Sequence, residues 1–455
     1  MNEPIKSRRE FLATVGVAGA ASVLVGSSEA RRGFAAEGQQ KLAIDGGTPV
    51  RKTLLSSSPY GPQFYDEVEK REILEVIESR KPFRWWKGGS KVLQFEEAYA
   101  AHIGVKYALG VTSGTTALSA ALAALEIGPG DEVILPAWTW YADYDTVVLA
   151  GALPVFAEID SSLNIDPEDI EARITPRTKA IIAVSLQGCP ADMGPILEIA
   201  RKHKLRVLED FSQCVGGRYE GKYLGSMGDI GISSFQQSKT ITAGEGGAVV
   251  TNDPMLFERA VRAHDVGALR SPYREGLGGG QLPGFAASNF RMNEFTGAIL
   301  KAQEQDLETI CKAVRSNARK VRDGIAGLPG LRMRKTPDLE GDLGVTVFLD
   351  HGTRQRRDRF LRALRAEGIS ASSPGGSVIL PIDERVENKV TVHPDWPSFN
   401  TPQGRAIRYG RECCPKTIDI QGRLGGVIMD PNFTNDDVAD IVRAIRKVYL
   451  AMGAA

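Results

Sequence analysis

The chain has 455 residues, of which 42% are hydrophobic and 25% are charged, the balance of an ordinary globular protein with material for a large and a smaller domain. Lysine plus arginine and aspartate plus glutamate both total 56, so the formal net charge is zero and no general attraction to nucleic acid or anionic membranes is expected. The five cysteines form no CxxC pair and the five histidines no HExxH pair, which argues against a disulfide framework and against a metal site.

The N-terminal segment has the pattern of an export signal. Arg8 and Arg9 precede an apolar run, residues 11–26, that is too short and too rich in small residues for a stable membrane span. Paired arginines before a mild apolar stretch are typical of a twin-arginine signal, with small-residue cleavage points near Ala30 or Ala36. We predict export to the periplasm or another extracytoplasmic space. A disordered tail or uncleaved anchor, with the protein in the cytoplasm, is the alternative. Residues 1–40 are excluded from the fold.

From residue 42 onward, short apolar runs alternate with helical patterns. Strands are expected at residues 107–111, 132–135, 153–156, 180–184, 206–209 and 248–251. Helices are expected at residues 115–125 and 193–203, and a turn at residues 128–131. Buried strands that alternate with helices predict an α/β fold with a mostly parallel central sheet.

The C-terminal third differs in pattern. A long helical pattern begins at Glu294 and continues through Val314, and a mixed α+β segment follows that ends in a helix at residues 435–452. We place the domain boundary near Lys320, inside a connecting helix. This gives a large domain at residues 41–320 and a small C-terminal α+β domain at residues 321–455.

Lys239 lies in the segment SSFQQSKTITAGEGG, residues 233–247, shortly before an expected strand. Most lysines on loops are simply solvated. A lysine that forms a Schiff base must lose its proton, and a desolvated pocket or cationic neighbours lower its pKa from the ordinary value of about 10.4. The glycines of the segment would let the backbone approach a flat cofactor.

Two further segments are suited to the same ligand. Asp210 ends an expected strand in RVLEDFSQ, residues 206–213, where a carboxylate could pair with a pyridinium nitrogen; capping of the next turn is the alternative. The segment VTSGTTAL, residues 111–118, is a strand, a tight turn and a helix start, which suits a phosphate; an ordinary threonine N-cap is the alternative.

Together these segments resemble those of the DegT/StrS-type aminotransferases of sugars and cyclitols, which are fold-type I enzymes that use pyridoxal 5′-phosphate (PLP). The resemblance runs in order from about residue 42 to residue 303, and more weakly to the C-terminus. Four other segments match: GPGDEVI (128–134), PAWTW (136–140), ITPRTKAI (174–181) and NFRMNE (289–294). Within the family, the sequences of RWWKGG (84–89) and of several other segments most resemble those of 3-amino-5-hydroxybenzoate synthase and the cyclitol aminotransferases.

The resemblance implies an aminotransferase that moves an amino group from an amino acid, glutamate or glutamine, to a keto sugar, nucleotide keto sugar or keto cyclitol. Lys239 would carry PLP as an aldimine and shuttle the substrate proton. Asp210 would hold the pyridine nitrogen, and Gln213 would donate a hydrogen bond to the phenolic oxygen.

The resemblance also implies how the rest of the cofactor is held. Gly114, Thr115 and Ser234 would bind the phosphate, with Asn289 reaching across from the second subunit of a homodimer that has two shared sites. Trp140 would stack on the ring face, and a core tryptophan is the alternative.

Some features depart from the family pattern or stay open. The chain has SLQG at residues 185–188, where many members have His-x-x-Gly, which leaves the substrate undetermined. Trp85 and Trp86 would either stack on a ring substrate or pack at the dimer interface, and His264 would either contact substrate or serve the structure.

Two other functions are weighed. A PLP-dependent dehydratase of the same family usually has histidine in place of the lysine, and Lys239 argues against it. An exported, non-catalytic ligand-binding protein with the same fold is opposed by the joint retention of Lys239, Asp210 and the phosphate loop.

Overall fold

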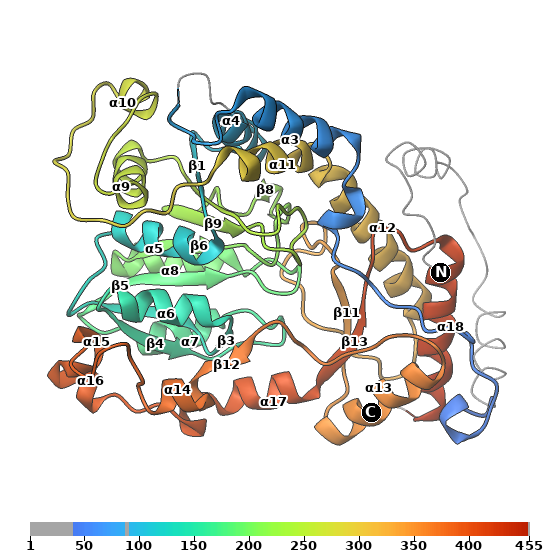
Figure 1. Cartoon of the computed structure of the whole chain (residues 1–455). Coiled ribbons are helices and arrows are strands. Elements are labelled where there is room, and N and C mark those ends of the chain that lie inside the picture. Colours follow the sequence, from blue (N-terminus) through green and yellow to red (C-terminus); the bar gives the residue numbers. More distant parts are fainter. Residues whose placement is uncertain (1–39, 87–90, 454–455) are drawn as a thin grey trace.

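The computed structural model describes residues 40–86 and 91–453, so the predicted twin-arginine signal lies outside the described residues. A seven-stranded sheet forms the centre of the larger part of the molecule (Figure 1). Its order is β1-β10-β9-β6-β5-β2-β4. The strands are β1 (Tyr107–Val111), β2 (Glu132–Pro136), β4 (Leu153–Ala157), β5 (Thr178–Val184), β6 (Arg206–Asp210), β9 (Ile230–Ser234) and β10 (Gly247–Thr251).

The sheet is mostly parallel, as the sequence predicted. Neighbours from β4 through β2, β5, β6 and β9 pair in parallel, and β10 runs antiparallel to both β9 and β1. The sequence pattern did not predict β9, whose residues IGISS include only two large apolar side chains. It is nevertheless fully buried, and Gly231 permits this because a Cβ there would lie 2.7 Å from the Gly225 Cα.

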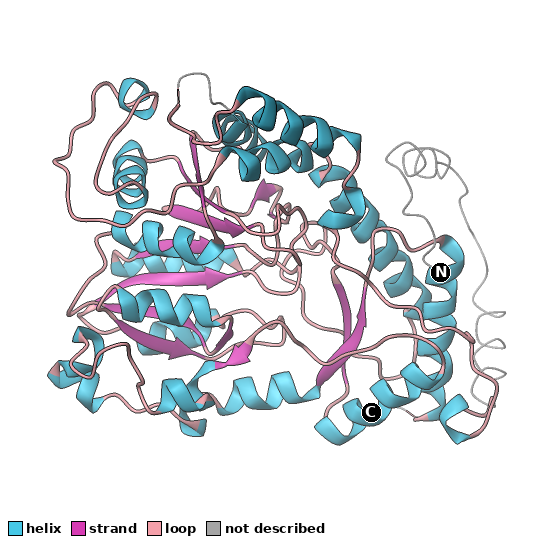
Figure 2. Ribbon diagram, in the orientation of Figure 1, coloured by secondary structure: helices cyan, strands magenta, loops and turns pink. Residues whose placement is uncertain are grey.

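Helices cover both faces of the sheet (Figure 2). Alternate side chains of β5 show the two layers, because Ile181 belongs to one apolar cluster and Ile182 to the other. One layer contains α5 (Gly114–Ala124), α6 (Tyr141–Leu149) and α9 (Pro254–His264). The other contains α4 (Lys91–Ile103), α7 (Pro167–Arg173), α8 (Met193–His203) and α11 (Glu294–Glu304).

The long helical pattern that begins at Glu294 is two helices and not one. Helix α11 ends at Glu304, and α12 (Leu307–Ile325) begins after Gln305 and Asp306. Leu300, Leu307 and Ile310 are all buried, so the apolar face continues across the interruption and the periodicity does not reveal it. The predicted domain boundary near Lys320 falls inside α12.

The C-terminal part is built on a small antiparallel sheet of β11 (Thr346–Asp350) and β13 (Leu424–Ile428), with α12, α13 (Arg354–Ala366) and α18 (Asn435–Ala451) packed around it. The first described residues join this part of the chain. The buried carboxylate of Glu367 accepts hydrogen bonds from the backbone of Ala43 and Val50 and from Lys447. Residues 43–50, which we assigned to the large domain, therefore contact the C-terminal part.

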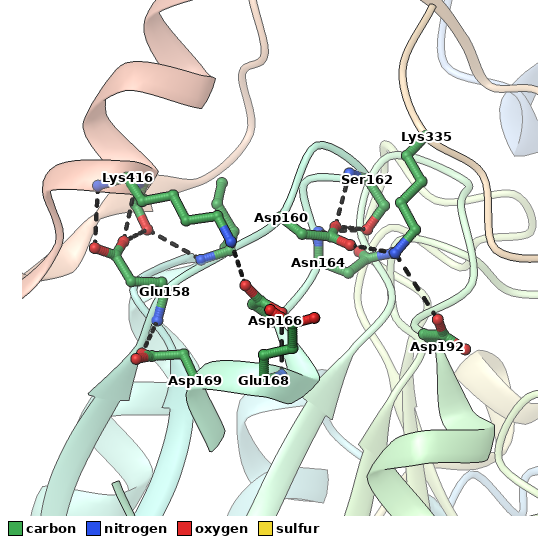
Figure 3. A network of polar contacts seen from close by, with 12 residues as sticks. Glu158, Asp160, Ser162, Asn164, Asp166, Glu168, Asp169, Asp192, Lys335 and Lys416 are labelled. Atoms are coloured by element: carbon green, nitrogen blue, oxygen red, sulfur yellow. Dashed lines mark hydrogen bonds and ion pairs between the residues drawn. The ribbon is translucent and has the colours of Figure 1, made fainter. Parts of the chain in front are cut away.

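A second C-terminal stretch lies along the edge of the large sheet. Strand β12 (Val378–Ile379) pairs with β3 (Trp138–Thr139), which follows β2 directly. Helix α17 (Pro415–Arg423) is joined to the segment after β4 by a polar network, in which Lys416 pairs with Asp166 and Thr417 donates to Glu158 (Figure 3). These contacts hold β12 and α17 of the C-terminal segment against the large domain.

The remaining elements are short or peripheral: η1 (Ala43–Asp45), η2 (Gly61–Phe64), α3 (Glu67–Ser79), β7 (Arg218–Tyr219), β8 (Lys222–Tyr223), α10 (Tyr273–Gly276), η3 (Leu380–Ile382), α14 (Glu384–Glu387), α15 (Pro397–Asn400), α16 (Pro402–Ala406) and η4 (Arg411–Cys413). Within residues 40–86 and 91–453, no helix has the length and apolar character that a membrane span requires.

Candidate active site

A cavity of about 450 Å³ opens where β5, β6 and β9 end and α5 begins. This is the position at which open α/β sheets bind ligands. The cavity lining brings together the predicted residues Gly114, Thr115, Trp140, Asp210, Gln213, Ser234 and Lys239.

Lys239 is carried by the hairpin that connects β9 to β10. The hairpin is closed by backbone hydrogen bonds from Phe235 to Gly246 (2.9 Å) and from Gln237 to Gly244 (3.0 Å). Burial lowers the pKa of Lys239, and the nearby carboxylates of Asp210 and Asp143 offset only part of this effect. A lowered pKa increases the fraction of uncharged amine, which is the form that attacks a carbonyl carbon.

The glycines that follow Lys239 shape the hairpin, and they are not among the residues that line the cavity. Gly244 and Gly246 have positive φ values of +82° and +149°, and a Cβ on Gly247 would lie 2.3 Å from the Ser113 carbonyl oxygen. Gly247 thus lets β10 pass against the turn that begins α5. Of this run, Glu245 is the residue that lines the cavity.

The start of α5 forms an anion cradle. The N-cap is Ser113, whose hydroxyl accepts from the Thr116 N–H (3.1 Å), so the alternative of a threonine cap is wrong. The first-turn N–H groups of Gly114 and Thr115 have no intrahelical acceptor and lie at the cavity wall. A Cβ on Gly114 would lie 2.7 Å from that of Ser234, so this glycine brings the serine hydroxyl beside the helix start.

Asp210 ends β6 and is only 7% exposed. Its Oδ1 accepts from the Ser212 N–H at 2.8 Å, so the carboxylate does cap the next turn. The same carboxylate also lines the cavity, and capping does not exclude a contact with a ligand.

Asp143 is a site residue that the sequence did not single out. It lies in the first turn of α6 and is 1% exposed. Its Oδ2 accepts from the Thr139 hydroxyl at 2.5 Å. Burial and the neighbouring charge of Asp210 raise the pKa of the Asp143 carboxyl well above its ordinary value. Its position three residues after the helix cap is typical of an exposed acid that complements the helix dipole, so nothing in the sequence pattern indicates that its side chain is buried.

Gln213 and Trp140 form the outer wall of the cavity. The amide of Gln213 donates to the Gly376 carbonyl (3.3 Å) and to the Ser377 hydroxyl (3.1 Å), which ties the cavity to the C-terminal segment. Trp140 is 51% exposed, so the core alternative is wrong, whereas Trp138 is the buried tryptophan of this stretch.

Other candidates lie outside the cavity lining. Asn289 is exposed, and its side-chain oxygen accepts from the Arg291 N–H at 3.3 Å. His264 is fully buried against the Val261 carbonyl, and burial lowers its pKa to about 3, so its role is structural and not substrate contact. Trp85 packs under the Arg84 guanidinium at 4.5 Å, and Trp86 is exposed.

Comparisons with known proteins agree with this arrangement. The sequence model of the DegT/DnrJ/EryC1/StrS aminotransferase family matches residues 66–373. The chain belongs to this family.

GDP-perosamine synthase of Caulobacter vibrioides is 39% identical over 316 residues, which cover 67% of this chain and 81% of that protein. L-Glutamine:2-deoxy-scyllo-inosose aminotransferase of Streptomyces kanamyceticus is 37% identical over 310 residues, 65% of this chain and 70% of that protein. The crystal structure of 3-amino-5-hydroxybenzoic acid synthase matches with a TM-score of 0.72 and 27% identity, and covers 87% of this chain and 99% of that one.

The chain is therefore a PLP-dependent aminotransferase. Its cavity fits the cofactor, because it offers an amine with a lowered pKa, a carboxylate for the ring nitrogen and an N–H cradle for the phosphate. Among the residues that the structure describes, no cluster of histidine, cysteine or acidic side chains could hold a metal ion.

Proposed function

We propose that this enzyme transfers an amino group from glutamate or glutamine to the keto group of a sugar, a nucleotide-linked sugar or a cyclitol. The proposal rests on the position of Lys239, whose amine has a lowered pKa and lies in the same cavity as Asp210 and the anion cradle of α5. The names of the relatives supply the acceptor class, since one makes GDP-perosamine and another aminates an inosose.

Each residue has a distinct task in this reaction. PLP, when bound, withdraws electrons from the carbon that carries the amino group. Lys239 Nζ would anchor the cofactor, and it would then remove the proton from that carbon and deliver it to C4′ of the cofactor. Asp210 keeps a proton on the ring nitrogen, and Trp140 covers the ring from the solvent side. Gly114, Thr115 and Ser234 hold the phosphate.

The reaction is tested in two halves with purified, PLP-loaded protein. Glutamate or glutamine alone should shift the visible absorption of the cofactor, and later addition of scyllo-inosose or a nucleotide-linked keto sugar should restore it. An aminated product, detected by mass spectrometry, supports the proposal. A product that has lost oxygen without gaining nitrogen would indicate a dehydratase, and no spectral response to any amino acid would indicate a non-catalytic ligand-binding protein.

We also propose a homodimer in which Asn289 completes the phosphate site of the second subunit. Asn289 is exposed and outside its own chain's cavity lining, as such a role requires. The test mixes the inactive variants Lys239→Ala and Asn289→Asp after joint unfolding and refolding. Hybrid dimers would contain one intact site and recover part of the activity. Hybrids that form without recovery, or a fully active monomer, would refute a shared site.

Export through the twin-arginine route is a separate proposal. It is supported by Arg8, Arg9 and the weak apolar run after them. Replacement of both arginines by lysine should leave uncleaved precursor in the cytoplasm. Unchanged fractionation of that variant would count against this route.

A further inference from the structure

Asp143 has an oxygen that no described group satisfies. The carboxyl is 1% exposed, and Thr139 donates to Oδ2. Oδ1 is buried and has no hydrogen-bond donor among the described residues. An ionised carboxylate left in this state would be costly, because a buried charge requires several donors or a counter-charge.

Besides Thr139, the side chain that interacts with Asp143 by a hydrogen bond is that of a second acid, Asp210. Asp210 approaches it closely enough to form a hydrogen bond when one of the two acids carries a proton. Two ionised carboxylates can only accept, which explains why Oδ1 has no donor while Asp210 is adjacent. The charged groups that act on Asp143 are Asp210 and Lys239, and burial together with Asp210 outweighs the lysine.

The two acids are not equivalent. Asp210 Oδ1 accepts a hydrogen bond from the backbone N–H of Ser212, whereas Asp143 Oδ1 has no donor among the described residues. Asp143 is the more deeply buried of the pair and has one hydroxyl donor. The burial and the hydrogen-bond partners of the pair therefore favour a shared proton located on Asp143.

We propose that Asp143 is a positioning residue that stays protonated and donates a hydrogen bond from Oδ1 to the carboxylate of Asp210. The inference rests on the placement of Asp210 at the ring nitrogen of PLP. In this arrangement the pair has a single negative charge, which matches one protonated ring nitrogen. Asp143 also restricts the rotation of the Asp210 side chain, so that the carboxylate is oriented before the cofactor binds.

Substitution of Asp143 distinguishes a neutral donor from an anion. Asparagine has the shape of a protonated aspartate, and its amide can accept from Thr139 while it donates to Asp210. Asp143→Asn should therefore bind PLP within about twofold of the wild-type dissociation constant. Asp143→Ala removes the donor to Asp210 and should weaken PLP binding about tenfold, as expected for one hydrogen bond to a charged group. Asp145→Asn is the matched control, because Asp145 is on the same helix but pairs with Arg385.

A second measurement reports the proton directly and does not need activity or correct PLP affinity. Infrared spectra of the apoenzyme at neutral pH should contain a protonated-carboxyl band. The difference between the wild-type and Asp143→Asn spectra should show the loss of this band, and the Asp145→Asn spectrum should retain it. The proposal is overturned if that band is absent, or if Asp143→Asn weakens PLP binding as much as Asp143→Ala does. If Asp143→Ala does not fold, the asparagine variant and the infrared band still decide. Failure of the wild-type protein to bind PLP would refute the role of the cavity and leave the infrared result on the pair intact.

Discussion

Two buried acids of the large domain, Glu158 and Asp143, differ in how many hydrogen-bond donors surround their carboxylates. Glu158, 6% exposed at the junction with α17, accepts from the backbone N–H groups of Lys416 and Thr417 and from the Thr417 hydroxyl. Asp143, 1% exposed in the cavity, has one donor and an acidic neighbour. The carboxylate of Glu158 therefore has hydrogen-bond donors on both oxygens, whereas that of Asp143 has a donor on one oxygen only.

This difference in hydrogen bonding distinguishes Glu158, which joins the C-terminal segment to the large domain, from the cavity residues, which are available to a ligand. Around Glu158 every contact is completed within the chain, so the network stabilises the fold and needs no partner (Figure 3). In the cavity, the pKa of Asp143 is raised and that of Lys239 is lowered, as is usual where titratable groups perform chemistry. Substitutions in the two regions should therefore affect different measurements.

The largest effect is expected from Lys239→Ala. Transamination should fall to background because Lys239 is the one lysine among the described residues that line the cavity. The unfolding midpoint should change little, since removal of a desolvated amine relieves an unfavourable burial. Turnover and urea unfolding measure the two properties. Lys312→Ala, on an exposed face of α12, is the control. Measurable turnover by the alanine variant would separate Lys239 from the chemistry.

Asp210→Ala should lower kcat on the order of a thousandfold at saturating PLP, which corresponds to about 4 kcal/mol of transition-state stabilisation. The reason is the loss of the negative charge that keeps the ring nitrogen protonated. Steady-state kinetics with the amino donor in excess measures this loss. Near-normal turnover would show that the carboxylate only caps its turn.

Glu158→Ala tests the other side of the comparison. The variant leaves buried N–H groups of Lys416 and Thr417 without an acceptor, so the free energy of unfolding should fall by about 3 kcal/mol. We expect kcat to stay within about twofold of wild type in conditions where the variant is folded. Urea titration followed by circular dichroism gives the stability. A large loss of kcat with unchanged stability would mean that the two regions are not separate.

The smallest effect concerns the ion pairs that His102 of α4 makes with Glu304 at the end of α11 and with Glu308 at the start of α12. Burial opposes a charge on His102, but hydrogen bonds to Glu304 and Glu308 prevail and raise its pKa to about 9. The pKa is raised relative to the unfolded chain, so the stabilisation is fully present below pH 6.5 and is lost as the pH rises through about 9. We expect about 1 to 2 kcal/mol after screening by solvent. His102→Gln should remove this part of the pH dependence of unfolding, and an unchanged pH profile would contradict the assignment.

The sequence predicted most of the sheet because buried apolar runs separated by helical periodicity are a local signal. It missed β9, whose burial depends on Gly231 and on neighbours distant in the chain. The break at Asp306 was hidden by an apolar face that continues through it. The sequence predicted the roles of Lys239, Asp210 and the start of α5, because an amine, a carboxylate and a helix N-terminus are the groups that a cofactor of this kind requires. It did not indicate Asp143, whose role depends on Asp210, which approaches it only in the folded chain.

The central claim is that Lys239 is the amine that holds PLP in this cavity. Borohydride reduction of the purified, PLP-loaded protein fixes the cofactor on its amine, and peptide mass spectrometry then locates it. We predict one modified peptide that contains residues 233–247, with the added mass on Lys239 and no labelling in the Lys239→Ala variant. Modification of a different lysine, or equal labelling of the variant, would contradict the account.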